Sequence, residues 1–243
     1  INNILYMGDK EITQLNSILE ELSIPPSISE NRICETYADF IDYKDNDVKF
    51  TWFQKKVFDE GECDKIVDYV TSLGTNVRQE GTTLGDTLGA GVVGNRVWRK
   101  SVLVFLPKTE AFMWVYKKIG ETIKDINNQH YKFDLYGMME DLQYGEYDSS
   151  YKGFYDWHMD LGRGSINKRK ISISIQLSDE DDYEGGELQF QIGRNIEIAP
   201  KSRGSGIVFP SFFCHKVTPV TKGVRKSLVL WVSGPTFLSL IHI

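Results

Sequence analysis

Two histidines and one aspartate have the types and spacing of a metal site. His158 and Asp160 lie two residues apart in FYDWHMD (154–160), and His215 follows 55 residues later in FPSFFCHKV (209–217). Residues i and i+2 of a strand point to the same face, so an imidazole and a carboxylate there could bind one ion. Two histidines and one carboxylate form the facial triad that holds Fe(II) and leaves coordination positions open. Zinc is compatible with the same ligands, but no glutamate stands beside them as a clear general base.

A fixed positive charge follows the second histidine. Arg225 lies ten residues after His215, in KGVRKS (222–227). A guanidinium is always charged, and its planar fork can bind a carboxylate through two hydrogen bonds. The sequence therefore predicts a site for a dicarboxylic co-substrate, with one end at the metal and the other at Arg225.

The elements that position these residues are predominantly β. After about residue 132, short strand-like segments follow one another between Gly-, Asp- or Pro-rich turns, at 133–144, 154–160, 170–177, 187–192, 196–199, 206–209, 212–217 and 226–232. The segment KISISIQL (170–177) alternates isoleucines and leucine on one face with serines and glutamine on the other. Many short strands at this spacing predict an antiparallel sandwich or barrel.

The N-terminal half contains the predicted helices. Apolar residues at helical spacing predict a helix over 11–22, followed by a polar connector over 23–49. A strand is expected at 51–58, then a helix from Asp59 as N-cap to Leu73, ended by Gly74. We expect β structure over 96–106 and a long helix over 109–128, with Thr109 as its N-cap.

Composition excludes several classes of protein. The chain has 243 residues, 28 basic against 34 acidic, and a formal net charge of −6, which gives no reason to expect nucleic acid as a partner. No apolar run is long enough for a membrane span. The three cysteines, Cys34, Cys63 and Cys214, contain no CxxC pair and predict neither a disulfide framework nor a thiolate zinc site. No signal peptide is visible, although the chain begins with Ile1, and we expect a cytoplasmic protein.

A glycine-rich segment, GTTLGDTLGAGVVG (81–94), contains a GxGxxG pattern at Gly89, Gly91 and Gly94. Nucleotide binding by that pattern needs a helix after it, and the stretch that follows is β-like, which disfavours this function. The alternatives are a surface loop and a lid that closes over substrate. Arg96, Trp98 and Arg99 follow directly and could contact a substrate.

These motifs together resemble the 2-oxoglutarate/Fe(II)-dependent dioxygenases, in particular the prolyl 4-hydroxylase-like and PKHD-type hydroxylase branch. The family pattern is an H-x-D, an EGGEL-type turn, a distal His after a Phe-Pro segment, and an Arg or Lys about ten residues later. The matching segments are QYGEY (143–147), FYDWHMD (154–160), RKISISIQLSD (169–179), YEGGELQF (183–190) and GSGIVFPSFFCHKVTPVTKGVRKSLVLWVSGP (204–235). Residues 53–70 match the family less specifically, and 1–49 have no assigned counterpart.

The resemblance implies a role for each matching residue. His158, Asp160 and His215 would bind iron, and Arg225 would bind the distal carboxylate of 2-oxoglutarate. Residues expected to line the co-substrate pocket are Tyr147, which has the family's spacing from Gln143, the fallback Tyr144, and Ser174; Trp231 could line the substrate side. The implied cofactor is Fe(II), the implied co-substrates are 2-oxoglutarate and O₂, and ascorbate is a candidate reductant.

The expected fold is a double-stranded β-helix, a jelly-roll of two facing sheets with N-terminal helices packed on it. We expect an extension over 1–49, a single dioxygenase domain over 50–235 with its motif core at 143–235, and a tail over 236–243. The resemblance implies hydroxylation of a prolyl or similar residue in a peptide or protein, with release of succinate and CO₂. The alternatives are the same chemistry on a free amino acid, small molecule or nucleobase, a non-catalytic jelly-roll binding module, and a zinc hydrolase. Oligomeric state is not predicted.

Overall fold

The computed structural model describes residues 51–81 and 98–237. The chain divides into two compact units, Ile1–Asp47 and Val48–Ile243, and the described residues all belong to the second. The helix expected over 11–22, the connector over 23–49, the glycines of 82–94 and Arg96 lie outside the described residues.

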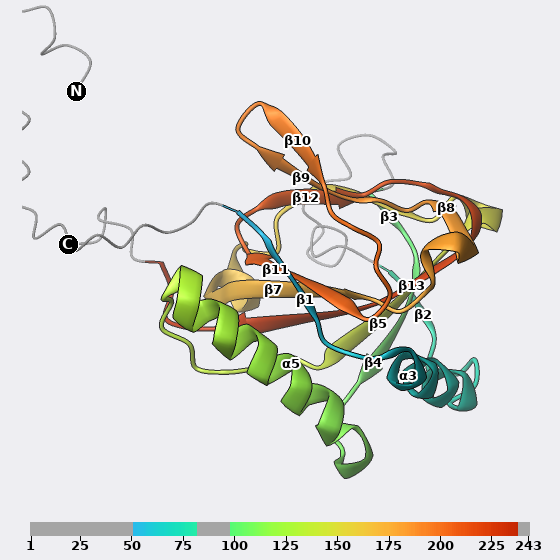
Figure 1. Cartoon of the computed structure of the whole chain (residues 1–243), viewed down its shortest axis with the longest axis horizontal. Helices are drawn as coiled ribbons and strands as arrows, with labels where there is room; N and C mark the ends of the chain where they lie inside the picture. The colour runs from blue at the N-terminus through green and yellow to red at the C-terminus, as the bar shows by residue number, and fades with distance from the viewer. Residues whose placement is uncertain (1–50, 82–97, 238–243) are drawn as a thin grey trace, which may run out of the picture. The chain divides into compact units, whose positions relative to one another are not determined.

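Two antiparallel sheets form the body of the described chain (Figure 1). The larger sheet has the order β1 (Phe53–Lys56), β11 (Ser205–Pro210), β7 (Arg169–Gln176), β13 (Val220–Ser233), β5 (Leu142–Asp148), β4 (Val102–Leu106) and β2 (Gln79–Glu80), and β8 (Tyr183–Gly185) pairs with β13. The smaller sheet has the order β10 (Asn195–Ile198), β9 (Leu188–Ile192), β12 (Cys214–Val217), β6 (Phe154–His158) and β3 (Arg99–Lys100). Strands far apart in the sequence are neighbours in both sheets, such as β1 with β11 and β6 with β12. This is the double-stranded β-helix predicted from the sequence.

Two helices cover the outer face of the larger sheet, α3 (Glu60–Ser72) and α5 (Met113–Ile126) (Figure 1). As predicted, Asp59 caps α3: its carboxylate accepts from the backbone N–H of Glu62, whose side chain accepts from the N–H of Asp59. Gly74 follows the helix with a φ of +74°, a conformation that glycine adopts without a Cβ penalty. The longer helix, expected over 109–128, consists of the 3₁₀ turn η2 (Glu110–Phe112), α5, and the π turn η3 (Asn127–Tyr131).

The alternation in β7 divides the protein's interior into two environments. Ile171, Ile173 and Ile175 are fully buried and belong to the main apolar core with residues of α3 and α5. Ser172 and Ser174 face the space between the two sheets and are also buried. Every residue of β7 is buried, so its serines are polar residues in the interior rather than on the surface.

Three further 3₁₀ turns connect the strands: η4 (Ser149–Tyr151), η5 (Gly164–Lys168) and η6 (Glu180–Asp182). Several strand boundaries differ from the prediction, and the largest difference is at β5. A strand was expected over 133–144, but β5 begins only at Leu142, and the preceding segment forms an isolated bridge between Gly137 and Ser233. No helix among the described residues is both long and apolar enough to cross a membrane.

Candidate metal and co-substrate site

His158 and His215 are direct neighbours across two paired strands. His158 ends β6, and its Cα partner on β12 is His215. Paired residues in an antiparallel sheet point to the same face. The two imidazole rings accordingly lie with their centroids 4.1 Å apart.

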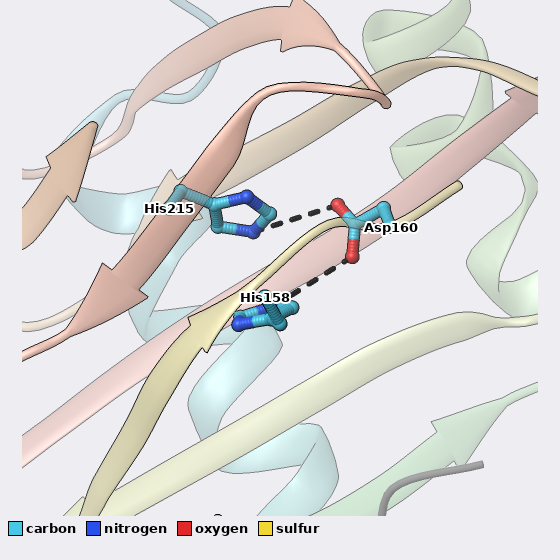
Figure 2. A group of neighbouring side chains, drawn as sticks. All are labelled: His158, Asp160 and His215. Atoms are coloured by element: carbon cyan, nitrogen blue, oxygen red, sulfur yellow. Dashed lines mark ion pairs between the residues drawn. The ribbon is translucent and has the colours of Figure 1, made fainter. Parts of the chain in front are cut away.

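Asp160 completes the group from just beyond the end of β6, rather than from within the strand as the i, i+2 argument assumed. The backbone N–H of Leu161 donates to the carbonyl of Ser211 at 2.9 Å, which holds this segment against the end of β11. Figure 2 shows the carboxylate pointing at both rings, with Oδ1 3.9 Å from His158 Nε2 and Oδ2 3.6 Å from His215 Nε2. One ligand atom from each residue lies within 4.8 Å of the others.

Each imidazole is oriented by a backbone carbonyl. His158 Nδ1 lies 2.7 Å from the carbonyl oxygen of Asp156, and His215 Nδ1 lies 2.9 Å from that of Phe213. A carbonyl can only accept, so each Nδ1 carries the proton and donates it. Each Nε2 therefore presents its lone pair toward Asp160, which is the arrangement that a metal ion requires of histidine.

The charge states of the group also suit a cation. Burial, together with the neighbouring His215, lowers the pKa of His158 to about 3, so its ring is neutral at physiological pH. Burial alone would raise the pKa of Asp160, but His215, His158 and Arg169 outweigh it, and the pKa is lowered. Asp160 Oδ2 is buried and accepts no hydrogen bond from the described residues. A buried carboxylate with an unsatisfied oxygen, facing two imidazole lone pairs, fits a divalent cation.

The three side chains line a cavity of about 290 Å³ between the two sheets. Arg225, on β13, lines the same cavity and is only 4% exposed. Its Nη1 donates to Ser227 Oγ at 3.2 Å, and no described carboxylate lies within the 4.0 Å of an ion pair. A buried guanidinium without a carboxylate partner is costly, so this end of the cavity favours an anionic ligand.

The comparisons with known proteins agree with this site. Residues 142–233 match the model of the 2OG-Fe(II) oxygenase superfamily. The matched segment contains His158, Asp160, His215 and Arg225. A PKHD-type hydroxylase from Synechococcus sp. (strain CC9902) is 38% identical over 80 residues, which are 33% of this chain and 36% of that protein. A second, from Alteromonas mediterranea, is 36% identical over 86 residues, 33% of this chain and 38% of that protein. The matched region is thus little more than a third of either relative.

Solved structures of prolyl hydroxylases share the fold of this chain. A prolyl-4-hydroxylase from Pseudomonas putida superposes with a TM-score of 0.59 at 16% identity, covering 79% of this chain and 96% of that one. A prolyl hydroxylase from Trichoplax adhaerens, solved with a hypoxia inducible factor peptide fragment, superposes with a TM-score of 0.62 at 16% identity, covering 86% of this chain and 94% of that one.

The structure brings most of the predicted site residues to one cavity. The residues that line it are His158, Asp160, His215, Arg225, Tyr147, Ser174, Trp231 and Arg99. Tyr147 is the Cα partner of Arg225, and the guanidinium carbon lies 5.4 Å from the centroid of its ring.

Two predicted positions lie elsewhere. Tyr144 belongs to the apolar core on the opposite face of β5. It lies three residues before Tyr147, and strand residues separated by an odd number of positions point to opposite faces. Its hydroxyl donates to Glu146, and it is not a co-substrate ligand in this arrangement. Trp98 is 41% exposed and does not line the cavity.

Sequence reasoning missed a partly buried clamp in the cavity wall. Arg169 begins β7, donates to both carboxylate oxygens of Glu140, and donates through Nη1 to the carbonyl of Asp160 at 3.2 Å. Its guanidinium carbon lies 3.7 Å from the ring centroid of Trp231. The available signal was a cation at the start of a strand that is otherwise apolar on one face. Glu140 carried none, because it lies in the segment that we expected to be a strand.

Proposed function

We propose that this protein is an Fe(II)- and 2-oxoglutarate-dependent dioxygenase that hydroxylates an unactivated C–H bond. In the overall reaction, 2-oxoglutarate and O₂ yield succinate and CO₂, and one oxygen atom enters the substrate. The substrate class that we favour is a prolyl or similar residue in a peptide or protein.

The observation that carries the proposal is the pairing of two complementary features in one cavity. The His158, Asp160 and His215 group has the chemistry of a facial triad, which leaves positions open for other ligands. Arg225 supplies an unmatched buried positive charge in the same cavity. A metal chelator with a distal carboxylate satisfies both, and 2-oxoglutarate is such a molecule.

The protein's own residues would then hold the reactants in place. Arg225 would bind the distal carboxylate through its fork, with Ser227 fixing one side of the guanidinium. Tyr147 and Ser174 line the same end and could donate to that carboxylate. The bound iron supplies the activation of O₂, which the side chains of this chain cannot provide.

The geometry disfavours a zinc hydrolase. Apart from Asp160, Glu140 is the one carboxylate among the described residues that lines the cavity. Both of its oxygens accept hydrogen bonds from Arg169, which leaves Glu140 badly placed to take a proton from water. Hydrolysis would lack its general base.

The preference for a peptide rests on similarity alone. The curated relatives are named PKHD-type hydroxylases, and one structural neighbour was solved with a peptide fragment. A free amino acid or another small molecule would use the same metal chemistry. Ascorbate as reductant and a cytoplasmic location remain predictions from the sequence.

The test is oxygen-dependent turnover of 2-oxoglutarate by the full chain with Fe(II). We expect succinate to form, and a prolyl peptide library to gain the mass of one oxygen atom in step with it. Succinate without peptide oxidation would point to a small-molecule substrate. If iron binds but no succinate forms with any substrate or without one, the proposed activity is wrong.

A further inference from the structure

A second guanidinium in the cavity, that of Arg99, lies beside the metal-binding group. Arg99 begins β3, and its guanidinium carbon lies 4.6 Å from the centroid of the Tyr155 ring. The same ring stacks on His158, at a centroid distance of 3.5 Å and nearly parallel. A single aromatic ring therefore separates the charge of Arg99 from an imidazole of the metal-binding group.

The arginine side chain is held in this position by neutral groups. Its Nε donates to Ser101 Oγ at 2.7 Å, and Nη2 donates to the Tyr147 hydroxyl at 3.5 Å. Gly81 passes over this contact: a Cβ there would lie 2.3 Å from Ser101 Oγ and 2.8 Å from Arg99 Nε. The absence of a side chain at residue 81 is therefore required for Arg99 to lie where it does.

Arg99 has no counter-charge in the described part of the chain. No described carboxylate forms an ion pair with it, and Nη1 makes no hydrogen bond to a described residue. The other two cavity arginines differ in this respect. Arg169 is matched by Glu140, and Arg225 would be matched by the distal carboxylate of 2-oxoglutarate.

We propose that Arg99 binds a carboxylate of the substrate, so that the enzyme selects peptides with an acidic side chain close to the hydroxylated residue. The inference deepens the proposed function and rests on it, because 2-oxoglutarate must occupy Arg225 and the metal with its own two carboxylates. A third anion is then needed to match Arg99. The terminal nitrogens of Arg99 can still donate hydrogen bonds into the cavity. A guanidinium group binds a carboxylate through charge-assisted hydrogen bonds, so a carboxylate is the anion that fits.

The experiment measures binding without turnover. The full chain is loaded with Fe(II) and 2-oxoglutarate under nitrogen and titrated with fluorescent prolyl peptide libraries. The libraries are identical except that the positions flanking the proline are Asp, Asn or Lys. We expect the Asp library to bind at least about tenfold more tightly than the Asn library, and the Lys library to bind most weakly.

Variants assign the preference to Arg99. Arg99→Gln should abolish the difference between Asp and Asn libraries, and Arg99→Lys should restore part of it. The control is Arg194→Gln, which removes an exposed cation from the turn between β9 and β10 and should leave the preference intact. An equal loss of preference in Arg194→Gln would assign it to overall charge and overturn the proposal.

Two further results would also overturn it. One is equal binding of the Asp and Asn libraries to the unmodified chain. The other is a loss of 2-oxoglutarate binding in Arg99→Gln as large as the loss of acidic-peptide binding, because this would place Arg99 at the co-substrate. Succinate formation, measured on the same preparation in air, separates the two proposals: its absence contradicts the dioxygenase activity, whereas its presence without an acidic preference contradicts only the role of Arg99.

Discussion

Arg225 and Tyr147 stand directly opposite each other on β13 and β5, and the guanidinium carbon lies 5.4 Å from the centre of the tyrosine ring. Both side chains are almost completely buried, at 4% and 3% exposed. This pair forms the end of the cavity that would receive the distal carboxylate of 2-oxoglutarate. The aromatic face offsets part of the cost of burying the cation, but it supplies no counter-charge.

Replacing this cation should affect the co-substrate far more than the metal. Arg225→Ala should weaken 2-oxoglutarate binding by about 2–5 kcal/mol, because a charge-assisted contact is lost in a buried site. Tyr147→Phe should have a smaller effect. Calorimetric titration with 2-oxoglutarate and, separately, with Fe(II) measures the two affinities. Lys226→Ala is the matched control, because this neighbouring cation does not line the cavity. Equal weakening of iron and 2-oxoglutarate binding in Arg225→Ala would contradict the carboxylate role.

Removal of one imidazole should remove the metal. His158→Ala should lose Fe(II) binding and with it 2-oxoglutarate turnover, because two of three ligands cannot hold the ion tightly. Thermal unfolding with and without Fe(II) under nitrogen provides a readout besides activity. The unmodified chain should be stabilised by the metal, and His158→Ala should not. His130→Gln, which changes a histidine stacked on Phe53 and away from the cavity, should keep the metal-dependent stabilisation. Undiminished iron binding in His158→Ala would exclude His158 as a ligand.

The clamp between Arg169 and Glu140 should stabilise the folded state more than an exposed salt bridge does. The Arg169 side chain is 10% exposed and that of Glu140 is 35% exposed, and the contact is bidentate. Arg169→Leu should lower the free energy of unfolding by about 1–3 kcal/mol, since Glu140 and the Asp160 carbonyl both lose a donor. The double variant Arg169→Leu/Glu140→Leu should cost less than the sum of the single changes, as urea unfolding would measure. Strict additivity would show that the two side chains do not interact.

A buried thiol should make the free energy of unfolding decrease as the pH becomes alkaline. Burial raises the pKa of Cys63 on α3 from 9.0 to about 11, and the residue is 0% exposed. The folded state thus favours the neutral thiol. The resulting contribution to the free energy of unfolding is on the order of 2–3 kcal/mol. It is fully present below pH 9 and is lost as the pH rises toward 11. The difference in unfolding free energy between the unmodified chain and Cys63→Ala, followed from pH 7 to 11, isolates it. A difference that does not change over this range would contradict the raised pKa.

The sequence was informative wherever chemistry depends on residue type and chain spacing. His158, Asp160, His215 and Arg225 could be selected because imidazole, carboxylate and guanidinium have few alternative uses in such a pattern. The alternation in KISISIQL (170–177) correctly predicted one apolar face and one polar face. It did not predict that both faces are buried, because burial of the serines depends on the second sheet.

Tertiary structure decided the questions that turn on strand register. Strand side chains alternate with a period of two, so the start and phase of β5 determine whether Tyr144 or Tyr147 enters the cavity, and the sequence placed that strand too early. The sequence also did not predict contacts between distant segments. Glu140 meets Arg169, and Arg99 pairs with Tyr155, only because strands far apart in the sequence lie close together within a sheet. By itself the sequence determined the chemical types at the site, because these reside in single side chains. Only the tertiary structure decided which charged side chains have an oppositely charged partner and which are available to a ligand. This pairing depends on distances between strands that are far apart in the sequence.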